Sequence, residues 1–362
     1  MVKQKKSSRE DPKPQRGVAP TEVEDDSKFD RALRPKILKE FVGQKKIVGK
    51  LKVFIEAAKG RKEALDHVLF MGPPGLGKTT LANIIANELG SELISTTGPS
   101  LERPGDLAGI LTSMQDGVVL FIDEVHRMPA AVEEILYGAM EDYRVSIVVD
   151  RGPGARSVQL GLNPFTLVAA TTRAGLLSNP FRSRFGIIER LAYYEDEELQ
   201  SIVERSASIL DVDIDEESSF EIARRSRGTP RIANRFLRRT RDYADVDNKG
   251  KITLEVARHA LQQLEVDKTG LDEMDKKILM TVIDYYKGGP AGVNAVAAVV
   301  GEDAGTIEEV YEPFLLQKGY LRRTLRGREA TEKAYELIGR EKKASSMQTE
   351  LPIDRPEQST EN

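Results

Sequence analysis

The segment Gly72-Pro73-Pro74-Gly75-Leu76-Gly77-Lys78-Thr79-Thr80 constrains this chain most, because it matches the phosphate-binding pattern G-x-x-x-x-G-K-[ST]. An apolar strand, Val68 to Met71, precedes the segment, and a helical pattern of apolar residues follows it from Leu81 to Leu89. Glycines let backbone amides turn inward around phosphate oxygens, and the start of a helix adds partial positive charge. Strand, loop and helix in this order therefore predict a nucleotide site.

Residue types within this loop assign individual roles. We expect Lys78 to reach the β- and γ-phosphates of ATP, and Thr79 to offer its hydroxyl to Mg²⁺. Gly75, Gly77 and Thr80 complete the predicted nucleotide-binding loop.

Two further apolar runs of strand length end in polar residues. The run Gly117 to Ile122 leads into Asp123-Glu124, and the run Phe165 to Ala170 leads into Thr171-Thr172. Because parallel strands present their carboxyl ends at one edge of a sheet, these residues should lie beside the phosphate loop. We expect Asp123 to hold the metal and Glu124 to polarise the attacking water, and a hydroxyl of Thr171 or Thr172 could hydrogen-bond the γ-phosphate or that water. Together with the loop, the two acids favour hydrolysis over binding alone.

Composition excludes several other kinds of chemistry. The chain has no cysteine, which excludes disulfides, thiolate metal sites and cysteine nucleophiles, and which fits a reducing compartment. No apolar run has membrane-spanning length, so we expect a cytoplasmic protein without a membrane partner. The formal net charge of -4 means that any binding of nucleic acid needs a local basic surface.

The apolar pattern changes along the chain and predicts three folded domains between two disordered tails. Buried strands alternate with helices in the first domain, the second is purely helical, and the third has three helices followed by a basic hairpin, which is typical of a winged helix. The predicted boundaries are 1–28 for the N-terminal tail, 29–192 for the α/β domain, 193–267 for the helical domain, 268–340 for the winged helix and 341–362 for the C-terminal tail.

Arginines at two places suit contact with phosphate. Arg182 and Arg184 lie in a turn flanked by proline and glycine, where either could be presented to a partner as an arginine finger. Taken alone, such a turn is more commonly solvated surface. Arg231, in Gly228-Thr229-Pro230-Arg231, lies in the first turn of a helix, where its charge opposes the helix dipole. An anionic phosphate at that helix start explains its position.

The order of these motifs resembles the AAA+ ATPases and, more narrowly, the bacterial RuvB family, the ATPase motors of Holliday-junction branch migration. This resemblance implies an α/β AAA+ (P-loop NTPase) domain, an all-α lid domain and a C-terminal winged-helix domain, and it covers about residues 29–339. The segments that carry it are Leu33-Arg34-Pro35, Phe41-Val42-Gly43-Gln44, Gly72 to Thr80, Asp123 to Arg127, Ala170 to Leu176, Ser183 to Gly186, Gly228 to Asn234 and the basic hairpin Arg322 to Arg328.

The resemblance also implies roles for single residues. Thr172 and Arg231 would be the two nucleotide sensors, and Arg184 would act as a finger on the ATP of a neighbour in a homohexameric ring. Further residues would lie at the nucleotide, either in its adenine and ribose pocket or at the subunit boundary. They are Leu33, Arg34 and Tyr194 in the pocket, and Glu141, Asp142 and Tyr143 at the boundary.

The same resemblance implies partners. Residues 144–161 predict a hairpin around Gly152-Pro153-Gly154; in the family such a hairpin docks the junction-binding protein RuvA, although a merely structural hairpin is the alternative. Arg323 and Arg328 match the positions that contact the duplex arms of a four-way junction, and a RuvC-type resolvase is a further implied partner. The other function left open is a nucleotide-switched DNA-binding protein of initiator or clamp-loader type, which does not translocate.

Overall fold

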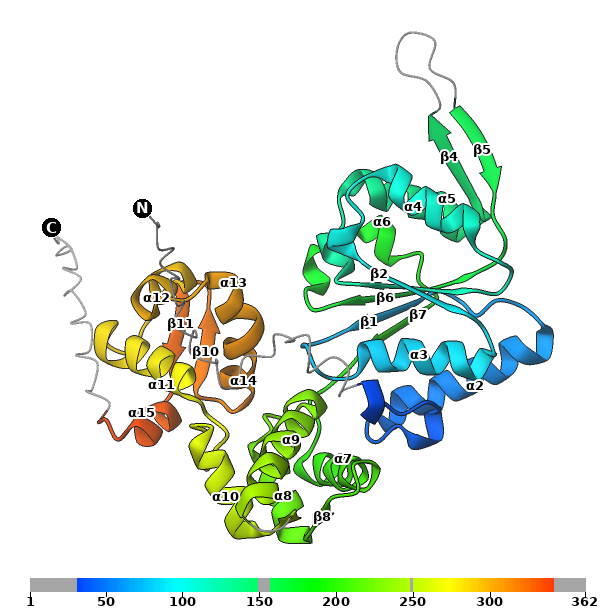
Figure 1. Cartoon of the computed structure of the whole chain (residues 1–362). Coiled ribbons are helices and arrows are strands. Elements are labelled where there is room, and N and C mark those ends of the chain that lie inside the picture. The colour runs from blue at the N-terminus through cyan, green and yellow to red at the C-terminus, as the bar shows by residue number, and fades with distance from the viewer. Residues whose placement is uncertain (1–30, 149–156, 248–249, 342–362) are drawn as a thin grey trace, which may run out of the picture.

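The computed structural model describes residues 31–148, 157–247 and 250–341. The chain passes from an α/β part through a helical part into a third part with a small hairpin (Figure 1). The two predicted tails lie outside the described residues, except for Glu341. No helix in these ranges has both the length and the apolar character to cross a membrane.

A five-stranded parallel sheet forms the centre of the α/β part, in the order β2-β3-β6-β1-β7. The three predicted strands are its three inner strands, and the two edge strands were not predicted. The strands are β1 (Val68–Met71), β2 (Leu93–Thr97), β3 (Val119–Asp123), β6 (Thr166–Thr171) and β7 (Ile187–Arg190).

Helices cover both faces of this sheet, which gives three layers. Alternate residues of one strand enter different cores: Val68 and Phe70 pack with one helical layer, and Leu69 packs with the other. The first layer holds α2 (Lys45–Arg61) and α3 (Lys78–Leu89), and the second holds α4 (Pro104–Ser113), α5 (Ala130–Asp142) and the short α6 (Asn179–Arg182). The predicted α/β architecture is confirmed.

The helical part packs into the same core as the first helical layer, through residues such as Leu199 and Val203. Ile209 of the same helix is 46% exposed, because Ser206 and Ala207 continue its buried face. The elements are α7 (Asp196–Ile209), α8 (Glu216–Arg225), α9 (Pro230–Asp247) and α10 (Leu254–Gln263), with the short paired strands β8 (Asp213–Ile214) and β9 (Lys251–Ile252).

The third part has its own apolar core and the predicted order of three helical segments and a hairpin. Two of its helices contain π-helical turns, at residues 281–285 and 307–311. The elements are α11 (Glu273–Met280), α12 (Val293–Val300), α13 (Ala304–Thr306), α14 (Glu312–Gln317), β10 (Leu321–Thr324), β11 (Gly327–Ala330) and α15 (Glu332–Ile338).

The predicted hairpin in residues 144–161 has two antiparallel strands, β4 (Arg144–Val148) and β5 (Ser157–Gly161). It projects away from the three layers (Figure 1). Val158 and Leu160 are exposed on it, whereas the predicted turn at residues 152–154 lies outside the described residues.

Candidate functional site

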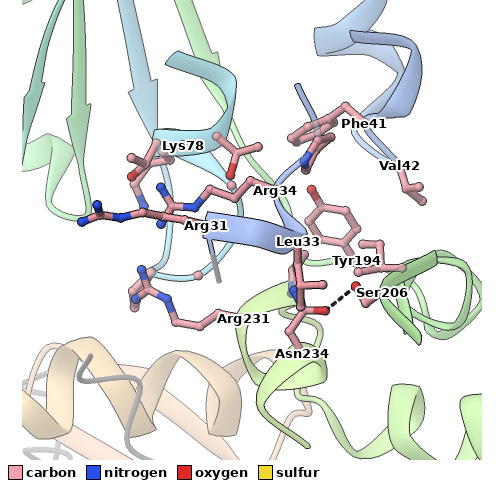
Figure 2. Close-up of a pocket in the computed structure, with 18 of the residues that line it drawn as sticks. Arg31, Leu33, Arg34, Phe41, Val42, Lys78, Tyr194, Ser206, Arg231 and Asn234 are labelled. Atoms are coloured by element: carbon pink, nitrogen blue, oxygen red, sulfur yellow. Dashed lines mark hydrogen bonds between the residues drawn. The ribbon is translucent and has the colours of Figure 1, made fainter. Parts of the chain in front are cut away.

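A cavity of about 580 Å³ lies between the carboxyl edge of the sheet and the helical part. Side chains from both parts approach one space, with Lys78, Arg34 and Arg231 reaching it from different elements (Figure 2). The predicted residues that line it are Leu33, Arg34, Gly75, Gly77, Lys78, Thr79, Thr80, Asp123, Glu124, Thr172, Tyr194 and Arg231.

The phosphate loop depends on glycine at its two inner positions. Gly75 and Gly77 have positive φ angles of 81° and 100°. A methyl group at Gly75 would lie 3.1 Å from the Cβ of Arg231, and one at Gly77 would lie 3.2 Å from the ring of Phe41. Glycine therefore supplies both the left-handed backbone and the room that the loop needs against the helical part.

Lys78 is the buried cation of this loop, with only 7% of its surface exposed. Its Nζ donates to the carbonyl oxygens of Gly72 and Pro73, at 2.8 and 2.7 Å. Burial lowers the pKa of Lys78 to about 8; the charge of Asp123 opposes this shift and that of Arg231 adds to it. The ammonium is thus destabilised until an anion joins it.

This shift predicts that nucleotide binding weakens in alkaline solution. A bound phosphate stabilises the protonated lysine, so above pH 8 binding must first take up a proton. We expect the affinity for a non-hydrolysable ATP analogue to be about tenfold weaker at pH 9 than at pH 7. Equilibrium titrations measure this, and Lys78→Arg, which stays charged, should show a smaller change. Equal affinities of the wild type at the two pH values would contradict the proposed role of Lys78.

Asp123 and Thr79 lie together at the edge of the sheet. The Thr79 hydroxyl donates to Oδ2 of Asp123 at 3.3 Å, and the backbone N–H of Glu124 donates to Oδ1 at 2.9 Å. Magnesium commonly takes one or two protein ligands and completes its shell with phosphate oxygens and water. This pair therefore fits a divalent cation that bridges to a nucleotide.

Thr172 provides independent support for a ligand in the cavity. Its hydroxyl oxygen is buried and has no hydrogen-bond partner among the described residues, and the residue lines the cavity. A buried hydroxyl without a partner is unfavourable unless a ligand supplies one. A phosphate oxygen or an ordered water would satisfy it.

Glu124 has a left-handed backbone, with a φ of 48°, directly after β3. Its carboxylate accepts a hydrogen bond from Arg127 at 2.9 Å. Next to it, Nδ1 of His126 lies 3.0 Å from the hydroxyl of Thr171. Glu124 therefore lines the cavity, and one of its two carboxylate oxygens is paired with Arg127.

Tyr194 connects the loop to the helical part. Its hydroxyl donates to the carbonyl of Leu76 at 3.1 Å, and its backbone N–H donates to the carbonyl of Gly228 at 2.9 Å. The sequence did not identify several other lining residues, including Phe41, Ser206 and Asn234. Asn234 accepts a hydrogen bond from the Ser206 hydroxyl at 2.8 Å (Figure 2). It lies one helical turn after Arg231 on α9, and this spacing could have predicted that both residues face the cavity.

The predicted residues Glu141, Asp142, Tyr143 and Arg184 are not among the described residues that line this cavity. Arg184 instead contacts Glu141, with 3.2 Å between Nη2 and Oε1, and donates to the carbonyl of Pro180 at 2.5 Å. Its guanidinium also lies 4.3 Å from the ring centre of Tyr137. The structure brings Arg184 and Glu141 together, but away from the nucleotide site of their own chain.

The two predicted DNA-contacting arginines are paired with carboxylates. Nε of Arg323 and Nη2 of Arg328 donate to the buried Glu312 at 2.9 and 2.8 Å, and both arginines also reach Glu308. The side chain of Arg328 is only 13% exposed, whereas that of Arg323 is 54% exposed. Of the two arginines, Arg323 therefore presents more of its charge to solvent.

The winged helix also reaches the nucleotide cavity, which the sequence did not predict. Glu309 and Val310 line the cavity. Nε of Arg173, the residue after Thr172, lies 2.7 Å from Oε1 of Glu309. Two sequence-distant domains thus meet at the strand end that carries Thr172.

Comparison with known proteins gives the same organisation. The family model described as the Holliday junction DNA helicase RuvB P-loop domain matches residues 33–191, the RuvB AAA lid domain matches 194–267, and the RuvB C-terminal winged helix domain matches 268–339.

Solved structures of Thermotoga maritima RuvB, described as a Holliday junction branch migration motor, are similar to the whole described fold. One has a TM-score of 0.79 and 52% sequence identity, and the match covers 86% of this chain and 99% of that one. A variant of the same protein with a proline replaced by glycine has a TM-score of 0.80 at 52% identity, covering 85% of this chain and 99% of its own. The chain therefore belongs to the RuvB family of Holliday junction DNA helicases, with a P-loop ATPase domain, an AAA lid and a winged helix.

Proposed function

We propose that this chain is the subunit of a hexameric ring that hydrolyses ATP, translocates duplex DNA and thereby drives branch migration of Holliday junctions in recombination and repair. The cavity carries this proposal, because it combines a phosphate loop, two acids and a buried unpaired hydroxyl in a chain that also contains a winged helix.

Each residue of the cavity has a chemical task in this proposal. Lys78 binds the β- and γ-phosphates, and Thr79 with Asp123 would hold Mg²⁺, which would supply neutralisation of the phosphate charge. Glu124, of which only Oε2 is paired with Arg127, accepts a proton from the attacking water. Thr172 and Arg231 contact the terminal phosphate from the sheet and from the lid, while Leu33, Arg34 and Tyr194 enclose the adenosine.

A ring is supported by the position of Arg184 outside the cavity of its own chain. An arginine on the surface of one subunit can complete the site of the next, as arginine fingers do in trans. We propose that Arg184 acts in this way and that Glu141, Asp142 and Tyr143 lie at the same boundary, since Glu141 holds the guanidinium in the single chain.

The partners follow from two exposed surfaces. The hairpin of β4 and β5 presents Val158 and Leu160, which suits an apolar contact with a RuvA-type protein at the junction. The hairpin of β10 and β11 presents Arg323, which suits backbone contact with a duplex arm without sequence specificity. A RuvC-type resolvase would bind the same junction.

The energetics of branch migration explain why a motor is needed. Each step breaks base pairs and forms equivalent ones, with stacking of about 1.4 kcal/mol lost and regained per step. The net free energy change is near zero, so ATP hydrolysis is required for direction and speed rather than to offset a net cost.

Migration of a synthetic four-way junction tests this proposal. The assay contains the chain, a RuvA-type partner and either ATP or a non-hydrolysable analogue. We expect migration with ATP and none with the analogue. A protein that binds both ATP and the junction but leaves the junction unmoved would favour the nucleotide-switched DNA-binding protein instead.

We expect the wing arginines to differ in their effect on DNA binding. Arg323→Ala should lower the slope of log affinity against log salt by about 0.9, the value for one lost phosphate contact. Arg328→Ala should change the slope less and should lower the unfolding temperature, because it removes a partner of the buried Glu312. Titrations at several salt concentrations measure both slopes, with Arg340→Ala, which removes an ion pair to Asp284, as control. An unchanged slope for Arg323→Ala would exclude that contact.

A further inference from the structure

Glu308 and Glu309 form an acidic pair on the π-helical turn of the winged helix, and they contact both the ATPase domain and the wing. Neither residue belongs to a sequence motif of the nucleotide site.

On the side of the ATPase domain, the partner of this pair is Arg173. Its Nε lies 2.7 Å from Glu309 and its Nη2 lies 3.7 Å from Glu308. The backbone of Arg173 is fixed at the end of β6, because its N–H donates to the Thr171 hydroxyl at 3.0 Å. A change at Thr172, the adjacent residue that lines the cavity, therefore acts directly on the base of the Arg173 side chain.

On the side of the wing, Glu308 is shared with the two arginines of the hairpin. Its Oε1 accepts from Arg328 at 2.8 Å and from Arg323 at 3.3 Å, while its Oε2 is the oxygen nearest Arg173. One carboxylate thus faces three cations from two domains. Glu308 therefore links the Arg173 side chain to both arginines of the wing.

We propose that Arg173 is a positioning residue that couples the presence of the γ-phosphate to the DNA affinity of the wing. This inference rests on the proposed function, because it takes the cavity to bind ATP and the wing to bind DNA. Without a γ-phosphate, Arg173 holds the turn with Glu308 and Glu309 against the ATPase domain. A γ-phosphate beside Thr172 repels Glu309, which lines the cavity, and so weakens the ion pair between Glu309 and Arg173. The contact between the turn at residues 307–311 and the ATPase domain then weakens. The Glu308 carboxylate shifts its pairing away from Arg173 and toward Arg323 and Arg328.

Such an exchange is thermodynamic coupling between two sites, so it is reciprocal and measurable as a ratio of affinities. The experiment measures the dissociation constant of the full chain for duplex DNA, once with ADP and once with a non-hydrolysable ATP analogue. We expect the two constants of the wild type to differ by about fivefold or more. In Arg173→Gln the ratio should approach one, and Arg173→Lys, which keeps a cation there, should retain part of it.

This ratio separates coupling from a merely structural role, because a structural loss weakens DNA binding equally with both nucleotides. Glu309→Gln reaches the same contact from the other domain and serves if Arg173→Gln fails to fold. Arg340→Gln, which removes an ion pair within the winged helix, is the matched control and should keep the wild-type ratio.

The outcomes distinguish this inference from the proposed function. A wild-type ratio of one, or a full ratio in folded Arg173→Gln, would overturn the coupling even if the wild type moves junctions. A ratio lost in Arg173→Gln but kept in the control would support the coupling, even if junction migration fails. Partial recovery in the charge-reversed pair Arg173→Glu with Glu309→Arg would support direct contact of these two residues.

Discussion

Lys78→Ala should reduce ATP hydrolysis by at least about 10²-fold and abolish junction migration. Lys78 is the buried cation at the base of the phosphate loop, bonded to the carbonyls of Gly72 and Pro73. Its ammonium stabilises charge on the transferring phosphoryl group, and alanine leaves those phosphate oxygens and both loop carbonyls without that donor. Steady-state ATPase with a four-way junction present, together with junction migration, measures the loss.

Lys50→Ala is a suitable control for this variant. Lys50 lies on an exposed face of α2 and pairs with Glu189 of β7. Removal of the Lys50 side chain should therefore leave hydrolysis near the wild-type rate. Normal ATPase in folded Lys78→Ala would refute the assignment of the nucleotide site.

Arg184→Ala should slow hydrolysis by about 10³- to 10⁵-fold while the same chain still binds ATP. Hydrolysis and binding should respond differently, because Arg184 is not among the described residues that line the cavity of its own chain. ATP binding in that cavity should therefore stay intact. Loss of hydrolysis would then reflect a site on the neighbouring subunit that lacks its arginine. Arg182→Ala, which changes an exposed arginine at the end of α6, is the matched control.

A mixing experiment tests whether Arg184 acts between subunits. In rings that contain both Lys78→Ala and Arg184→Ala subunits, some sites combine an intact Lys78 with an intact Arg184 from the neighbour. We therefore expect ATPase to recover in the mixture although each variant alone is inactive. Mixed rings that form but stay inactive would show that Arg184 does not complete a neighbour's site.

The sequence identified the strands that are buried on both faces and missed those at the edges. β1, β3 and β6 read as continuous apolar runs because helices cover both sides of the sheet there. β2, Leu93–Thr97, and β7, Ile187–Arg190, include polar and partly exposed residues, since an edge strand has a neighbour on one side. Their apolar pattern was too weak to distinguish them from loops.

The nucleotide site was predictable to the extent that a motif fixes it. Lys78, Thr79, Asp123 and Thr172 follow from strand ends that must share one edge. By contrast, the contact between Arg173 and Glu309 joins residues of different domains, and no local pattern encodes it. The burial of Arg328 was missed for the same reason, because a run of arginines does not reveal which of them face a carboxylate.

The order of the strands has a consequence for the biosynthesis of the protein. β6 lies between β1 and β3, pairing Val68 with Val168 and Val119 with Thr166, so β1 and β3 are not neighbours in the described sheet. On the ribosome, Lys78 and Asp123 emerge well before the strand that joins their supports. A nascent chain that stops before residue 166 pairs β2 with β3 but leaves the apolar β1 without either of its neighbours. Such a chain holds no assembled ATP site, and its exposed strand makes it a substrate for chaperones.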